Sequence, residues 1–182
     1  MKAITSFTFV LLFLGAQALA QGGADKMIVP GERIGPASLD MSLDVLLQAL
    51  GPRQAVGRPN NGQIVLQQGE TAEARAAAVH RFDHLGLRAV TPAGNESIGQ
   101  IATYNSADTD HGYSTKEGIK IGSTRSEVEA AYGTPTATTV PNPLQKQMIY
   151  DTRGVGLRLT PDHKVDLIQV FRPGAARERW KF

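Results

Sequence analysis

The chain has 182 residues, of which 41% are hydrophobic and 20% are charged, and its formal net charge is +2. These values fit a globular protein of one or two small domains and exclude collagen-like, coiled-coil and charge-driven disordered chains. The chain has no cysteine, which excludes disulfides, thiolate zinc sites and a cysteine nucleophile. Because the positive surplus is small, we expect no nucleic-acid partner.

The first twenty residues have the order of a secretory signal peptide. Lys2 supplies a positive charge, residues 7–14 form an apolar run, and Ala18-Leu19-Ala20 is a cleavage site of small residues. The run is too short to span a bilayer, which takes ~20 apolar residues, and no later stretch is long enough. No cysteine follows the run to carry a lipid anchor. We therefore expect cleavage after Ala20 and a secreted protein of the bacterial periplasm, without a transmembrane span.

A first short helix is predicted over residues 43–50. Ser42 is its expected N-cap, and Gly51-Pro52 ends it. An apolar stripe at helical spacing is formed by Leu43, Leu46, Leu47 and Leu50. So short a helix is marginal alone in water, so we expect it to lie on a sheet.

Strand signals follow this helix. The predicted strands span residues 79–83, 85–90 and 98–104, with residues 64–66 as a further candidate. Residues 70–79 have strong helix propensity, yet a strand is needed by Val79. We expect a polar loop or a short helix that turns into a strand near Ala77.

The segment His80-Arg81-Phe82-Asp83-His84 is a candidate metal site. On a helix, His80 and His84 share a face. On the predicted strand they also share one face, together with Phe82. Two histidines without a third ligand seldom define a site, so we expect partly exposed strand or turn histidines.

Residues 106–116 are polar and turn-rich, which predicts a linker. Asp108 and Asp110 fall at positions 3 and 5 of a calcium-loop pattern that starts at Ser106. Position 6 is His111 where that loop requires glycine. We therefore expect a solvated linker, no bound metal and no cofactor.

A second short helix is predicted over residues 125–132. Thr124 and Glu127 have the spacing of a capping box, and Gly133 followed by Pro135 ends the helix. Its apolar stripe is formed by Val128, Ala131 and Tyr132. Strands follow again, over residues 148–151, 155–159 and 165–171.

The two halves of the chain carry the same succession of signals. Phe82-Asp83 with Gly86-Leu87-Arg88 parallels Tyr150-Asp151 with Gly156-Leu157-Arg158. We therefore predict an α+β fold of two tandem repeats, each a short helix packed on a small antiparallel β-sheet. The expected division is a signal peptide (1–20), a first repeat (21–105), a linker (106–116), a second repeat (117–172) and a basic tail (173–182).

The segments PGERIGPASLDMSLDVLLQALG and EGIKIGSTRSEVEAAYGTPTAT, the latter continuing to residue 171, resemble repeats of the β-lactamase inhibitory protein-like fold. That fold includes the small outer-membrane-assembly lipoproteins, and the resemblance covers most of residues 28–172. It implies two joined sheets that leave one face open. This chain departs from the pattern at Asp40, where the second half has Gly122, and it lacks the lipidated cysteine of the assembly lipoproteins.

The residue patterns favour binding over catalysis. The chain has no Walker A, HExxH or nucleophile-elbow motif. We predict a non-enzymatic module that binds another envelope or secreted protein, with inhibition of a secreted enzyme as one form of such binding. Its candidate contact residues are the expected exposed aromatics Tyr104, Tyr113 and Tyr150, with Arg158, and Trp180 of the tail. The alternatives are an envelope assembly scaffold, or a small-ligand or metal module that uses His80, His84, Asp108 and Asp110.

Overall fold

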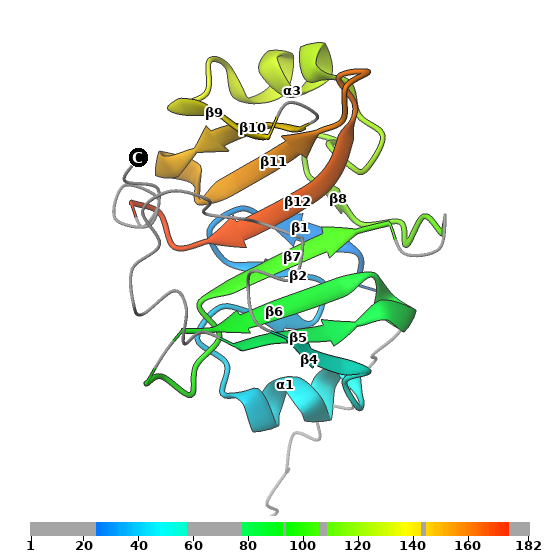
Figure 1. The fold of residues 1–182 in the computed structure, drawn as a ribbon, viewed down its shortest axis with the longest axis vertical. Helices are drawn as coiled ribbons and strands as arrows, with labels where there is room; N and C mark the ends of the chain where they lie inside the picture. Colours follow the sequence, from blue (N-terminus) through cyan, green and yellow to red (C-terminus); the bar gives the residue numbers. More distant parts are fainter. Residues whose placement is uncertain (1–24, 58–77, 93, 106–108, 143–144, 175–182) are drawn as a thin grey trace, which may run out of the picture.

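A computed structural model describes residues 25–57, 78–92, 94–105, 109–142 and 145–174 (Figure 1). The predicted signal peptide, the strand candidate 64–66 and Trp180 lie outside these residues. The described part is a mixed α+β fold with two sheets. None of its helices has the length and apolarity that a membrane span needs.

Two α-helices and two 3-10 turns occur among the described residues: α1 (Leu43–Leu50), α3 (Arg125–Tyr132), η1 (Asp83–Leu85) and η2 (Asp151–Arg153). The strands of the first half are β1 (Met27–Val29), β2 (Arg33–Ile34), β3 (Ala37–Ser38), β4 (Ala55–Gly57), β5 (Ala78–Phe82), β6 (Leu87–Thr91) and β7 (Gln100–Tyr104). The remaining strands are β8 (Ser114–Thr115), β9 (Ala137–Asn142), β10 (Gln145–Tyr150), β11 (Val155–Leu159) and β12 (Val165–Phe171).

The larger sheet is antiparallel throughout, with the order β4-β5-β6-β7-β12-β11-β10-β9. Its middle is the pairing of β7 with β12, in which Ala102 lies opposite Gln169. Moving outward from this pair, each side meets its strands in reverse chain order (Figure 1). The two halves of the chain therefore share one continuous sheet.

The smaller sheet has the order β3-β2-β1-β8. In it β1 runs antiparallel to β2 and parallel to β8, with Ile28 opposite Thr115. The end of the predicted linker 106–116 thus belongs to a sheet, and Tyr113 and Thr115 are buried. The prediction of a solvated linker is wrong for this part, because a two-residue strand is too short to show a period in the sequence.

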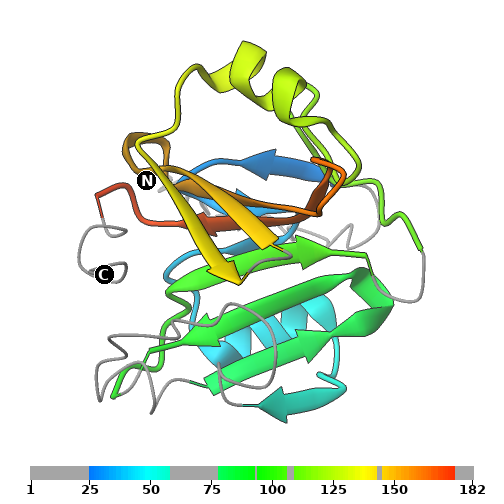
Figure 2. The ribbon, with the colours of Figure 1, turned by 45° about the horizontal axis from the view of Figure 1, so that its top comes forward.

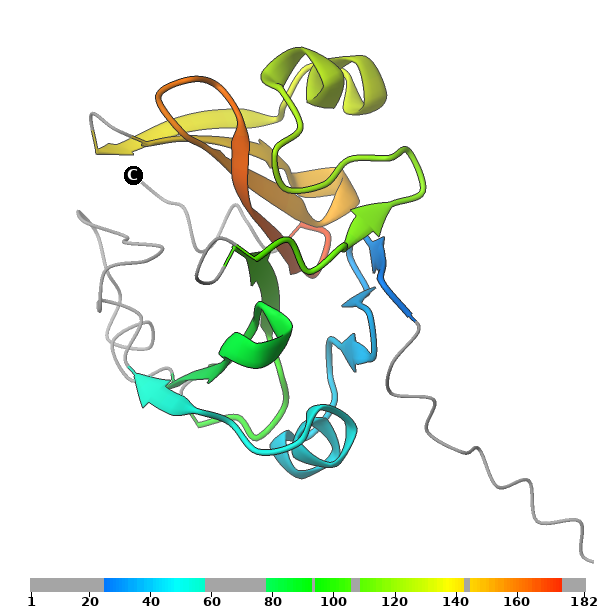
Figure 3. The same cartoon turned by 90° about the vertical axis from the view of Figure 1, so that its right-hand side faces the viewer.

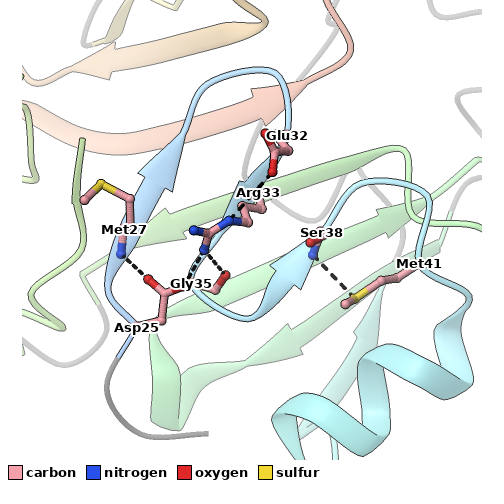
Figure 4. A network of polar contacts seen from close by, with 7 residues as sticks. All are labelled: Asp25, Met27, Glu32, Arg33, Gly35, Ser38 and Met41. Atoms are coloured by element: carbon pink, nitrogen blue, oxygen red, sulfur yellow. Dashed lines mark hydrogen bonds and ion pairs between the residues drawn. The ribbon is translucent and has the colours of Figure 1, made fainter. Parts of the chain in front are cut away.

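A network around Arg33 fixes the start of the described chain (Figure 4). The Arg33 guanidinium donates to the Asp25 carboxylate and, from Nη1, to the Gly35 carbonyl at 2.9 Å. The same carboxylate accepts the Met27 amide at 2.9 Å. Side chain and backbone therefore join β1 to the turn that follows β2.

Both helices begin and end where the sequence predicts. Thr124 caps α3 with a complete capping box, in which its hydroxyl accepts from the Glu127 amide and the Glu127 carboxylate accepts from the Thr124 amide at 2.6 Å. Ser42 caps α1 by accepting the Val45 amide at 3.3 Å. Gly51 and Gly133 end the two helices with φ of 78° each, a conformation that glycine adopts at low cost.

The apolar core fills one side of the larger sheet. Figure 3 shows the curved sheet from the side, with α1, α3 and the smaller sheet all on its convex side. Figure 2 shows α1 behind the strands of the first half. The largest fully buried side chains of this core include Ile28, Ile34, Leu46, Phe82, Leu87, Ile101, Met148, Leu157, Leu159 and Ile168.

The turn before β6 differs from the prediction. Residues 85–90 were expected as a strand, but 83–85 form η1 and β6 begins at Leu87. Gly86 closes η1 with φ 60°, and Gly154 closes η2 with φ 68°. The glycine that matches Gly86 is therefore Gly154 and not Gly156.

Candidate functional site

The face of the larger sheet opposite the helices carries a group of buried polar side chains. Because side chains alternate along a strand, residues paired across strands share a face. The registers place one row across β6, β7, β12 and β11, made of Arg88, Ala102, Gln169 and Gly156. The next row across β7, β12, β11 and β10 is made of Tyr104, Leu167, Arg158 and Gln147. We call the polar members Arg88, Tyr104, Gln147, Arg158 and Gln169 the polar face.

The strand patterns explain why these residues share one face. In β6, Leu87 and Ala89 point into the core on either side of Arg88. In β11, Leu157 and Leu159 do the same around Arg158. The apolar alternation of each strand therefore fixes the direction of its arginine.

Two aspartates hold polar groups at the margin of this face. Arg158 Nε donates to Asp166 Oδ1 at 2.8 Å. The Asp83 carboxylate accepts from the Tyr104 hydroxyl and from Arg81 Nε, the latter at 3.2 Å. Arg81 lies opposite Arg88 on the neighbouring strand. These contacts orient the side chains of Arg158 and Tyr104 on the polar face.

Burial sets the electrostatics of the polar face. It lowers the pKa of Arg88 to about 10, and the positive charge of Arg158 acts in the same direction. The Arg88 guanidinium lies 5.7 Å from the centre of the Tyr104 ring. Burial, followed by the hydrogen bond to Asp83, raises the pKa of Tyr104. Arg88 therefore stays cationic and Tyr104 stays neutral at physiological pH.

Two buried donors of the polar face have no hydrogen-bond partner in the described structure. They are Arg158 Nη1 and Gln169 Nε2. Arg158 is 8% exposed and Gln169 is 3% exposed. A buried donor without an acceptor costs about 1–3 kcal/mol, so these groups suit a ligand that brings oxygen acceptors to this face.

Two of the predicted contact residues, Tyr104 and Arg158, lie on the polar face, and their side chains point to the same side of the sheet. The expectation that Tyr104 is exposed is wrong, since it is buried on β7 with Leu167 opposite. A tyrosine in a central strand has neighbours on both sides, which its sequence position alone does not reveal.

Tyr113 and Tyr150 were also expected to be exposed, and both are buried. Tyr150 lies under α3, where its ring makes an edge contact with Tyr132 at 5.3 Å and its hydroxyl donates to the Gly133 carbonyl at 3.0 Å. Tyr113 packs in the core with the Lys26 ammonium 4.5 Å from its ring centre. Neither residue belongs to the polar face.

The structure separates the histidines of the candidate metal site. His80 is buried on β5 and contacts Arg53 Nη1 at 2.9 Å and Thr91 Oγ1 at 3.0 Å. His84 lies in η1, exposed, with its Nδ1 2.6 Å from Gln54 Nε2. The prediction of a partly exposed histidine is wrong for His80 and confirmed for His84.

The structure describes only one of the two candidate calcium ligands, Asp110. Asp110 accepts the Gly112 amide at 2.8 Å, as in a simple turn, and Asp108 lies outside the described residues. In the described part of the chain, no three histidine, aspartate or glutamate side chains gather as a metal site would require.

Arg88, Gln147 and Gln169 were missed from the sequence. The signal for Arg88 is its place inside an otherwise apolar strand, Leu87-Arg88-Ala89-Val90, where a charged residue is unusual. Gln169 shows the same anomaly within the apolar run Leu167–Phe171.

Comparison with known proteins gives matches to solved structures at low sequence identity. No family model and no curated protein matches the chain. A crystal structure of a DUF4309 family protein (YjgB) from Bacillus subtilis is 14% identical, with a TM-score of 0.47, covering 78% of this chain and 88% of the other. An extracellular protein containing a SCP domain from Bacillus anthracis is 8% identical, with a TM-score of 0.42, covering 78% of this chain and 46% of the other.

Proposed function

We propose that this protein is a secreted, non-enzymatic module that binds another envelope or secreted protein through the polar face of its larger sheet. The observation that carries the proposal is the pair of buried donors without acceptors, Arg158 Nη1 and Gln169 Nε2, on the face that the helices leave uncovered. Arginine and tyrosine are the side chains that most often anchor protein partners.

The protonation states of the polar face favour holding a ligand over proton transfer. Arg88, with a pKa of about 10, and Tyr104, with a raised pKa, each keep one protonation state at neutral pH. General acid–base catalysis works best with a pKa near the operating pH. Groups that do not titrate there can orient a partner's polar atoms but do not shuttle its protons.

The proposal includes an internal duplication, in which the two halves of the chain are copies of one unit. The matching order of strands around β7 and β12, the capped helices α1 and α3, and the glycine-closed turns η1 and η2 support two copies of one unit. Matching Gly86 with Gly154 aligns Arg88 with Gly156. One copy thus carries a long polar side chain where the other carries none, as expected if the shared face has specialised for one partner. The resemblance to the β-lactamase inhibitory protein-like fold belongs to this proposal.

Site-specific photocrosslinking tests the binding face. A photoreactive phenylalanine analogue is placed at Val90 or Gln100, which are opposite each other and half-buried beside the polar face. Matched controls carry it at Gln48 on α1 and Ser126 on α3, both exposed on the far side of the sheet. In envelope extract, we expect a discrete heavier product from Val90 and Gln100 alone. Monomer only, or the same products from all four positions, contradicts the proposal.

We also propose that residues 1–20 direct export to the periplasm. Mass spectrometry of the exported protein should give a chain that starts at Gln21. A product that retains residues 1–20 contradicts this part of the proposal.

A further inference from the structure

We propose that the polar face contains a specific site for one carboxylate group, bound by the guanidinium of Arg158 and the side-chain amide of Gln169. This deepens the proposed function, on which it rests only for the source of the carboxylate, a side chain of the bound protein. The site itself stands on contacts within the described residues.

The first support is the way in which Arg158 is held. Its Nε donates to Asp166 at 2.8 Å, which fixes the plane of the guanidinium while Nη1 has no partner in the described structure. A fixed donor loses little conformational entropy when a ligand binds. Nη1 is therefore a buried, fixed donor that lacks an oxygen acceptor.

The second support is the position of Gln169 relative to Arg158. Arg158 lies opposite Leu167, and Gln169 is two residues further along the same strand on the same face. Such diagonal neighbours have Cβ atoms about 7–8 Å apart, within reach of long side chains. One donor from each strand can therefore address one ligand group between them.

The number of donors selects a carboxylate. Arg158 Nη1 and Gln169 Nε2 are two donors, and a planar carboxylate presents two oxygens to such a pair. A phosphate has three strong acceptor oxygens and would need further donors to replace its hydration. The positive charge of Arg88 nearby favours any anion at this face.

Small residues flank Gln169 in its row. Ala102 lies on one side and Gly156 on the other. A Cβ added at Gly156 would lie 3.6 Å from Phe171 Cε1 and 3.9 Å from the Met148 carbonyl oxygen, with nothing else within 4 Å. Those are ordinary contacts, so position 156 can accept a side chain, which would extend over the face where the ligand is expected.

The test is a titration of the mature full-length chain, 21–182, followed by NMR of the ¹⁵N-labelled protein. The probe is acetate, exchanged against chloride at constant ionic strength, and the readout is the Gln169 side-chain amide signal, assigned by its loss in Gln169→Leu. We expect a saturable shift with acetate and none with chloride. No saturable shift, or tighter binding of inorganic phosphate than of acetate, overturns the carboxylate site.

Three variants separate the site from general effects. Arg158→Gln should weaken acetate binding roughly tenfold or more, as expected for loss of a charge-assisted hydrogen bond. Gly156→Val keeps both donors and should block acetate binding, because the valine side chain extends over the face. This variant tests the site even if Arg158→Gln fails to fold. Arg125→Gln, at a half-buried arginine of α3 that pairs with Glu129 on the far side of the sheet, should bind as the wild type does. Unchanged affinity in Gly156→Val overturns the assignment.

The two proposals fail separately. Acetate binding without a crosslink from Val90 or Gln100 retains the carboxylate site and rejects a protein as its source. A crosslink without acetate binding rejects the site and retains the protein-binding face.

Discussion

His80 is held in its uncharged form by its surroundings. Arg53 Nη1 donates to Nδ1 at 2.9 Å, which leaves Nε2 to carry the proton and donate to Thr91 Oγ1 at 3.0 Å. Burial, and then the positive charge of Arg53, lower the pKa of His80. A second proton on this buried ring would lie beside the Arg53 cation.

The pKa of His80 makes stability depend on pH. The unfolded chain, with a histidine pKa near ~6.5, binds a proton more readily than the folded chain does. The contribution of His80 to the free energy of unfolding is therefore complete above about pH 6.5 and is lost as the pH falls through the lowered pKa. We expect His80→Gln, which does not titrate, to lose less stability between about pH 7.5 and pH 5 than the wild type.

Urea unfolding at the two pH values measures this difference. The matched control is His84→Gln, which removes an exposed histidine and leaves His80 in place. An equal loss of stability on acidification in His80→Gln and in the wild type would show that His80 is not the group responsible.

At the scale of the helices, α1 and α3 have the same length but different caps. Thr124 and Glu127 form both hydrogen bonds of the capping box. The Thr124 amide, at 2.6 Å, and the Thr124 hydroxyl, at 2.9 Å, both donate to the Glu127 carboxylate and lower its pKa. Ser42 makes only the bond from the N3 amide, at 3.3 Å, the same length as the bond from the Glu127 amide to Thr124 Oγ1. The apolar stripe of α1 offsets its weaker cap, since Leu46 and Leu50 are both buried.

We expect Thr124→Ala to lower the free energy of unfolding by about 1 kcal/mol and Ser42→Ala to lower it by less. Ser126→Ala, an exposed serine within α3, is the control and should change it by less than about 0.5 kcal/mol. Chemical denaturation of the three variants gives the comparison. A larger loss in Ser42→Ala than in Thr124→Ala would contradict the role assigned to the complete box.

The elements predictable from the sequence are those with strong local signals. Both helices are confirmed, because caps and glycine stops fix their ends. β11 and β12 are confirmed at their full bounds, 155–159 and 165–171, because β11 alternates, most of β12 is an apolar run, and a clear turn separates them. The three-stranded start of the chain and β8 were not predicted, since strands of two or three residues contain no measurable period.

Over the whole molecule, the β7–β12 pairing joins the halves into one sheet. Five residue pairs, from Leu167 opposite Tyr104 to Phe171 opposite Gln100, connect the strands. One core cluster includes Leu46 of α1 and Val128 of α3. Among the described residues this one cluster spans both halves, so the halves should unfold together.

Leu46→Ala and Val128→Ala test this cooperativity, because both side chains are fully buried and each lies in a different half. We expect each variant to lose roughly 1–4 kcal/mol and to shift one and the same unfolding transition. Far-ultraviolet circular dichroism and tyrosine fluorescence should give coincident curves. Two separate transitions, with each variant moving only one, would mean that the halves are independent domains.

The candidate site was predictable only in part, and the reason lies at this same scale. Tyr104 and Arg158 were chosen from the sequence, yet their common face depends on the register of β7 against β12 and of β12 against β11. Gln169 is unusual in its apolar strand, but only that register places it beside Arg158. Contacts between strands far apart in the chain carry no local sequence signal.

The parallel pairing of β1 with β8 affects the order in which the chain can assemble. β1 is synthesised early, but its partner begins at Ser114. A chain emerging amino-terminus first therefore cannot bury Ile28 fully until residue 115 is free, and a fragment that stops before Ser114 leaves β1 paired with β2 alone. β1 can therefore complete its pairing only late in synthesis, and the amino-terminal part of the nascent chain stays incompletely folded until residue 115 has emerged.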